Sequence, residues 1–244
     1  MPASKGVRAH LALAEPHAAP GAPGHAGGLP LDLGALDAAL PDGGLLRGGV
    51  VELAVRGAGA CATSIALAAC GAAQREAQRL GGDTPWCAFI DPSRSLHAPG
   101  VRRAGVELER LLVVRPELAD LERIALRVVE SQVFAVVAID TIGVTGRSLS
   151  VPLAGFPRVI RRLSQAIEGT PRCVLLITDA AARRPLPLPV AMRLELGRPR
   201  PDRLQVQVAK DRRGRVGSPR SVAWTRPGAR AAAAPAPTPL QRPA

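Results

Sequence analysis

The stretch VVELAVRGAGACATSIAL, residues 50–67, has the layout of a strand, a glycine-rich turn and the start of a helix. A helix N-terminus of this kind can hold phosphate, because its backbone N–H groups and the helix dipole both favour an anion. The phosphate loop of nucleotide hydrolases reads G-x-x-x-x-G-K-[ST], where the lysine neutralises phosphate oxygens and the hydroxyl binds Mg²⁺. With Thr63 at the last position, Ala62 replaces the lysine, Cys61 the second glycine and Arg56 the first. The layout therefore predicts only a weak, degenerate nucleotide site, with backbone and hydroxyl groups from Gly57, Gly59 and Thr63.

A second candidate group is Asp140, which ends the apolar run FAVVAID. In a working phosphate-loop protein, an aspartate at the end of a later strand holds the metal ion. The order and spacing of the two motifs support this interpretation, and we add Asp140 to the weak nucleotide site. The alternative is an aspartate that caps a strand beside an ordinary glycine turn, and the residues themselves leave both interpretations open.

The elements that must position these groups follow from hydrophobic spacing. Continuous apolar runs at 49–55, 86–91, 111–114, 134–140 and 173–178 are typical of strands buried on both faces of a parallel sheet. Helical spacing predicts helices over 62–79, 117–132 and 155–167. After residue 189 the period changes to two, and AMRLEL, DRLQVQVAK and RSVAW predict antiparallel edge strands. We therefore predict an α/β fold, with a mostly parallel central sheet flanked by helices and antiparallel strands at its C-terminal edge.

One folded unit with two tails fits the length of 244 residues. Residues 1–28 are rich in Ala, Pro and Gly and are predicted to be disordered, apart from a short helix in GVRAHLALAE. Residues 226–244 are predicted to form a disordered, basic Pro/Ala-rich tail, which leaves 29–225 as the domain. The N-terminus lacks the apolar run of a signal peptide, and no stretch approaches the roughly 20 apolar residues of a membrane span. We expect a cytoplasmic protein without a membrane partner.

Four cysteines, Cys61, Cys70, Cys87 and Cys173, show no C-x-x-C pair and have apolar neighbours. Zinc sites usually present their cysteines in such closely spaced pairs. We expect reduced core residues and no metal site.

The net charge of +12 is placed unevenly along the chain. Residues 158–244 hold 18 Lys and Arg against 5 Asp and Glu, so the whole positive excess lies in the last third. A one-sided basic region favours a polyanionic partner, above all nucleic acid, while a solvated basic surface is the alternative. Tyr is absent and there are only 3 Phe and 2 Trp, which leaves little material for stacking on bases.

Several stretches resemble the RecA recombinase family over about residues 27–225. They are GGLPLDLGALDAALPDGGLLRGGVVEL, AAQREAQ, CAFIDPSRSLHAPGVRRAGVELERLLVVRPE, VVAIDTIG and VQVAKDRRGR. The resemblance implies a RecA-like core, which agrees with the α/β prediction.

The resemblance also shows what this chain lacks. RecA proteins have a glutamate that activates water two residues after the aspartate of FID, but here Ser93 stands two residues after Asp91. The glutamine that senses nucleotide at the end of the CVLLIT strand is replaced by Asp179. With the lysine also absent, we expect no enzyme activity and no cofactor beyond residual weak binding of ATP or ADP.

Two groups of cations match functional positions of RecA proteins. Lys210 and Arg212 stand where RecA proteins carry two lysines that reach across a subunit boundary toward the neighbour's ATP, which implies a RecA interface. The alternative for this pair is a basic turn that contacts only water. We expect DNA contacts from two regions that match the DNA-binding loops of RecA proteins and from the turn after DRLQVQVAK. The residues are Arg147, Arg183, Arg184, Arg212, Arg213 and Arg215.

A RecA-like core with a lost ATPase, shortened loops and a basic Pro/Ala-rich tail resembles the ImuA family. This resemblance implies an accessory protein of SOS-type DNA damage tolerance, which works with an ImuB-like Y-family protein and an error-prone polymerase III α-type subunit in mutagenic translesion synthesis. We expect non-specific DNA and RecA as further partners, and nucleoid association in the cytoplasm.

Two other functions are compatible with the same residues. A division inhibitor resembling SulA also has a RecA-like fold without a phosphate loop, but it would not need a basic C-terminal third. An active RecA-like ATPase or recombinase with unusual loop chemistry is the other alternative.

Overall fold

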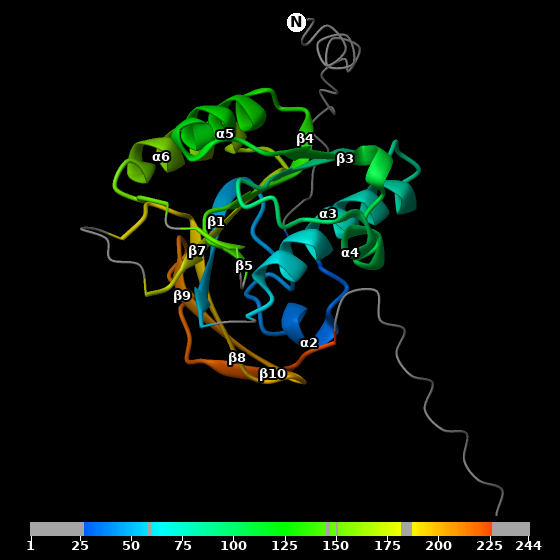
Figure 1. Cartoon of the computed structure of the whole chain (residues 1–244). Coiled ribbons are helices and arrows are strands. Elements are labelled where there is room, and N and C mark those ends of the chain that lie inside the picture. The colour runs from blue at the N-terminus through cyan, green and yellow to red at the C-terminus, as the bar shows by residue number, and fades with distance from the viewer. Residues whose placement is uncertain (1–26, 58–59, 145–146, 150, 182–186, 226–244) are drawn as a thin grey trace, which may run out of the picture.

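A single eight-stranded sheet forms the centre of the computed structural model, which describes residues 27–57, 60–144, 147–149, 151–181 and 187–225. The strand order is β10-β9-β8-β1-β7-β4-β2-β3 (Figure 1). The strands are β1 Gly49–Arg56, β2 Trp86–Ile90, β3 Leu111–Val114, β4 Phe134–Asp140, β7 Cys173–Asp179, β8 Met192–Arg200, β9 Arg203–Asp211 and β10 Arg220–Ala223. Two very short strands, β5 Gly143–Val144 and β6 Arg147–Ser148, form a separate hairpin that the sequence did not predict.

The strand pairing confirms the predicted α/β class. All pairs from β8 through β1, β7, β4 and β2 to β3 are parallel, while the β8–β9 and β9–β10 pairs are antiparallel. One part of the prediction is wrong: AMRLEL was expected at an edge of the sheet, yet β8 lies inside it, antiparallel to β9 as predicted but parallel to β1. Its alternating pattern arises because Met192, Leu194 and Leu196 are buried, while the residues between them are only half-buried.

Helices cover both faces of the sheet. Figure 1 shows α3 (Ala62–Arg79) and α4 (Ala98–Arg103) on one side, and α5 (Leu121–Glu130) and α6 (Phe156–Ile167) on the other. The predicted helices at 62–79 and 155–167 agree with α3 and α6, whereas 117–132 divides into the 3₁₀ turn η2 (Leu118–Asp120) and α5. Gln132 follows α5 with φ 55°, a left-handed conformation that cannot continue a helix. The remaining short elements are α2 (Gly34–Asp37) and η1 (Leu108–Arg110).

Alternate side chains of the central strands enter two apolar layers. Val51 and Leu53 of β1 belong to the layer under α3, and Val50 belongs to the layer under α5 and α6. The α3 side also contains Cys70, Cys87 and Cys173, all buried, and burial raises the pKa of the Cys173 thiol to about 12.

Most residues of the two predicted tails lie outside the described part of the chain. The N-terminal helix predicted in GVRAHLALAE and the basic tail at 226–244 lie outside the described residues. Of the predicted N-terminal tail, only residues 27 and 28 are described, and the Gly28 N–H donates to the Asp42 carbonyl at 3.1 Å. Within the described residues, no helix is both long and apolar enough to cross a membrane.

A buried ion pair joins the three central strands. The Glu52 side chain of β1 is fully buried and accepts a hydrogen bond from the Thr178 hydroxyl of β7 at 2.6 Å. Nη1 of Arg193, on β8, lies 3.1 and 3.2 Å from the two Glu52 oxygens. Arg193 Nε in turn donates to Glu195 at 3.3 Å, and Arg56 also donates to Glu195. A carboxylate without solvent contact is tolerated only with such partners, so the pair fixes β7, β1 and β8 side by side.

We predict that Arg193→Met lowers the free energy of unfolding by about 3 kcal/mol, because it leaves the Glu52 charge buried without its cation. The double variant Glu52→Leu, Arg193→Met should recover most of that loss, since an apolar pair carries no desolvation cost. Urea denaturation measures both values. Arg203→Met is the matched control: its side chain on β9 is 49% exposed, and its stability should stay within about 0.5 kcal/mol of wild type. A double variant no more stable than the single one would contradict the prediction.

Candidate functional site

A pocket of about 640 Å³ opens at the carboxyl ends of β1 and β7. Val55 and Gly57 line it from the end of β1, and Ile177 and Asp179 line it from β7. The start of α3, the segment leading into α4, and the β5 region form its other walls. Ligands of open α/β sheets bind in this type of crevice, outside the carboxyl ends of the parallel strands.

The degenerate phosphate loop forms one wall of this pocket. Gly57 has φ +74° and Cys61, the N-cap of α3, has φ 63° and ψ 16°, so the chain turns into the helix through left-handed conformations. Ala62, at the place of the lysine, is buried, and Thr63 is half-buried; both line the pocket. The structure therefore brings Gly57 and Thr63 of the predicted weak nucleotide site together, while Gly59 lies outside the described residues.

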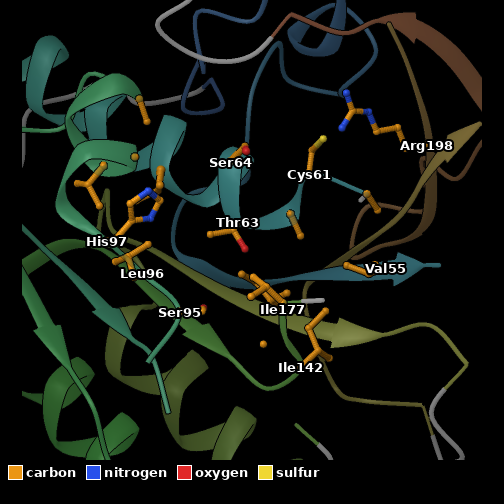
Figure 2. Close-up of a pocket in the computed structure, with 18 of the residues that line it drawn as sticks. Val55, Cys61, Thr63, Ser64, Ser95, Leu96, His97, Ile142, Ile177 and Arg198 are labelled. Carbon is orange, nitrogen blue, oxygen red and sulfur yellow. The ribbon is translucent and has the colours of Figure 1, made fainter. Parts of the chain in front are cut away.

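Basic side chains reach the pocket from other elements. His97 and Arg103 come from the α4 region, and Arg198 comes from β8. Figure 2 shows His97 and Arg198 on opposite sides of the pocket, with Thr63 and Cys61 between them. Sequence reasoning missed all three residues. Arg198 could have been found only by placing β8 beside β1, which its alternating pattern does not reveal.

The Asp140 carboxylate forms hydrogen bonds with the loop that follows β4. It is buried, and its Oδ1 accepts hydrogen bonds from the backbone N–H groups of Ile142 and Gly143, both at 2.9 Å. Burial raises the pKa of Asp140, against the opposing effect of these two donors. Asp140 is not among the lining residues of the pocket, and its contacts are those of an aspartate that caps the turn after β4.

The Asp91 carboxylate likewise forms hydrogen bonds with the loop that follows β2. Its Oδ1 accepts from the Ser93 hydroxyl at 2.8 Å and from the Ser95 N–H at 3.1 Å, and its Oδ2 accepts from the Leu96 N–H at 2.9 Å. Ser93, which stands where the resemblance places the glutamate, thus donates to Asp91 and orders the loop after β2. A hydroxyl in this role supplies no carboxylate base for water activation.

Lys210 and Arg212 lie far along the strands from this pocket. The Lys210 ammonium donates to the Leu188 carbonyl at 3.1 Å, and Arg212 Nη1 donates to the Gly48 carbonyl at 3.4 Å. Gly48 immediately precedes β1, so these contacts place both cations at the amino-terminal end of the central strand. The pocket occupies the opposite end of the same strand.

The predicted DNA-contacting residues differ in how their charge is balanced. Arg215 donates to Asp42 at 2.6 and 3.0 Å and to Asp211 at 2.6 Å, and the more exposed Arg213 lies 3.5 Å from Asp42. Hydrogen bonds from Arg215 lower the pKa of Asp42. Burial opposes ionisation of Asp211, but donors from Arg215 and the Arg213 backbone outweigh it and lower that pKa as well. Arg183 and Arg184 lie outside the described residues, as does the side chain of Arg147.

Comparison with known families identifies the core. The family model of the RecA N-terminal domain matches residues 29–154, slightly more than half of the chain. The match spans β1, the degenerate loop, α3 and the strands that end in the two aspartates. No curated protein matches the chain at a significant level. With this match and the observed sheet, the chain belongs to the RecA N-terminal domain family.

Proposed function

We propose that this chain is a non-catalytic RecA-like accessory protein of SOS-type DNA damage tolerance, of the ImuA type. The observation that carries the proposal is a phosphate loop without its lysine, beside carboxylates that hold their own loops. A RecA-like core that lacks the groups for ATP hydrolysis is suited to binding other macromolecules. The proposed partners are DNA, RecA, an ImuB-like Y-family protein and a polymerase III α-type subunit.

We predict no ATP turnover above the protein-free background, with or without DNA. The loss of one group that stabilises the transition state costs about 10²–10³ in rate, and here both the lysine and the glutamate positions are changed. Phosphate release measures this, and the Asp140→Asn variant should give the same reading as the wild type. A DNA-stimulated rate comparable with that of a working RecA, lost in Asp140→Asn, would instead establish the active ATPase.

DNA binding is proposed to involve the basic turn after β9, together with Arg147, Arg183 and Arg184. Arg212 and Arg213 are exposed there, whereas two carboxylates already balance the charge of Arg215. Phosphate contacts release counterions, so the logarithm of the affinity should fall linearly with the logarithm of the salt concentration.

For this interface, we predict that Arg212→Ala, Arg213→Ala reduces the salt slope on duplex DNA by about 1 to 2, since each lost phosphate contact removes about 0.9. Fluorescence anisotropy between low and moderate salt measures the slope. The matched control, Arg158→Ala, Arg161→Ala, removes the same charge from exposed positions of α6 and should leave the slope unchanged. Equal losses in the two double variants would mean that net charge, and not this turn, controls binding.

The proposed action on RecA is to cap a growing filament. A filament grows through head-to-tail contacts between two different surfaces of each subunit. Lys210 and Arg212 lie at one end of the central strand and the degenerate loop at the other, so the two features sit on different surfaces. A chain with a competent cation surface and an incompetent nucleotide surface would join one subunit and stop the next. Damaged DNA would then be directed from strand exchange toward bypass synthesis.

We predict that Lys210→Ala, Arg212→Ala abolishes inhibition of RecA strand exchange while DNA affinity falls only modestly, because Arg213 and the loop arginines remain. Joint-molecule formation and filament length, measured with stoichiometric protein, give the two readouts. The α6 double variant again serves as the control and should inhibit as strongly as the wild type. If the wild-type protein leaves filament length and strand exchange unaltered, the chain does not cap RecA.

A further inference from the structure

The pocket combines aliphatic walls with an excess of positive charge. Leu67, Leu96, Val101, Ile142 and Leu149 contribute apolar surface from α3, the α4 region and the segment after β4. Among the described lining residues, Arg103 and Arg198 carry positive charge and Asp179 carries the one carboxylate, whose Oδ1 accepts the Ala181 N–H at 2.8 Å. A ligand that matches these walls carries both an aliphatic group and negative charge.

Arg198 carries one of the two guanidinium groups that line the pocket. Its Nη2 donates to the Pro201 carbonyl, which holds the side chain at the β8–β9 turn. Its Nε is buried and has no hydrogen-bond partner in the part of the chain that the structure describes. Because Nε has no solvent contact, the positive charge of the guanidinium, and not a bond to Nε, is what favours a carboxylate in the pocket.

The rim of the pocket is apolar as well. Val144, in the β5–β6 hairpin, lines the pocket and is 40% exposed, which makes it one of the few large hydrophobic side chains on the described surface. An aliphatic side chain of a ligand would cover it and gain from its burial.

The lining argues against a nucleotide as the preferred ligand. No aromatic residue is among the lining residues, so a base has no ring to stack on. The wall formed by the start of α3 carries Ala62 where a triphosphate would need a cation. The two arginines stand instead among aliphatic walls, an arrangement suited to carboxylates beside leucine-like side chains.

We propose that this pocket binds an acidic, aliphatic peptide segment of a partner protein. An aliphatic side chain enters between α3 and α4 and covers Val144, and the Arg198 guanidinium attracts a neighbouring carboxylate. The inference rests on one part of the proposed function, that the pocket no longer serves ATP, and it adds the chemistry by which a partner is recognised.

The test uses the full-length protein and three fluorescein-labelled peptides. The first is built from alternating pairs of leucine and glutamate, the second has lysine in place of glutamate, and the third has serine in place of leucine. Fluorescence anisotropy should show saturable binding of the first peptide, with affinities at least about tenfold weaker for the other two.

Variants locate the binding site. Arg198→Gln and Val144→Asp should each weaken the acidic leucine peptide about tenfold, the first by removing a charged donor and the second by adding a like charge to the rim. Arg200→Gln is the matched control, because this exposed arginine of the same strand does not line the pocket, and its affinity should equal that of the wild type. Thermal denaturation checks that every variant is folded.

The outcomes separate the inference from the proposed function. Absent binding, equal binding of the three peptides, or binding that neither pocket variant weakens would overturn the peptide site and leave the DNA and RecA proposals standing. If ATP with Mg²⁺ binds tightly and displaces the acidic peptide, the pocket is a nucleotide site. That result would overturn both the inference and the proposed loss of nucleotide chemistry.

Discussion

The arrangement of the pocket depends on one carboxylate in the middle of the sheet. Glu52 has no solvent contact, and the Thr178 hydroxyl of β7 and the Arg193 guanidinium of β8 stabilise its charge. This requirement places β7 and β8 on either side of β1. The same placement brings Asp179, at the end of β7, and Arg198, near the end of β8, to the start of α3. A buried charge thus determines which side chains surround the degenerate loop.

Around that loop, two aspartates stabilise the segments that follow their strands. Asp140 accepts two backbone N–H groups of the turn after β4, and Asp91 accepts from the loop after β2 with the help of Ser93. Each carboxylate is buried, so each needs its donors to offset the cost of desolvation. These hydrogen bonds stabilise the turns that follow β2 and β4, next to the degenerate loop.

Much of the fold could be predicted because its signals are local. The run at 134–140 is continuous since β4 is covered on both faces, and the stripe of α6 matches its buried residues Phe156, Val159, Ile160 and Leu163. The position of β8 could not be predicted, because an alternating pattern reveals one apolar face and not the neighbouring strand. Consequently Arg198 was missed, whereas Gly57 and Thr63, which are contiguous with a strand and a helix, were found. The sequence also left two interpretations of Asp140, and its two hydrogen bonds to the turn after β4 could not be inferred from an apolar run that ends in aspartate.

The positive charge of the C-terminal third is divided by its carboxylate neighbours. Asp42, from the N-terminal segment, and Asp211 hold Arg215, so this arginine fastens the turn after β9 to the start of the domain. Arg212 donates instead to the Gly48 carbonyl, whose partial negative charge does not neutralise the charge of the guanidinium. Adjacent arginines in one turn therefore have different physical roles, although they look equivalent in the sequence. Because the field of a surface depends on the charges left unbalanced, a polyanion or a neighbouring subunit experiences Arg212 and Arg213 more strongly than Arg215. Part of the uneven charge of the sequence thus lies at the end of the sheet opposite the pocket.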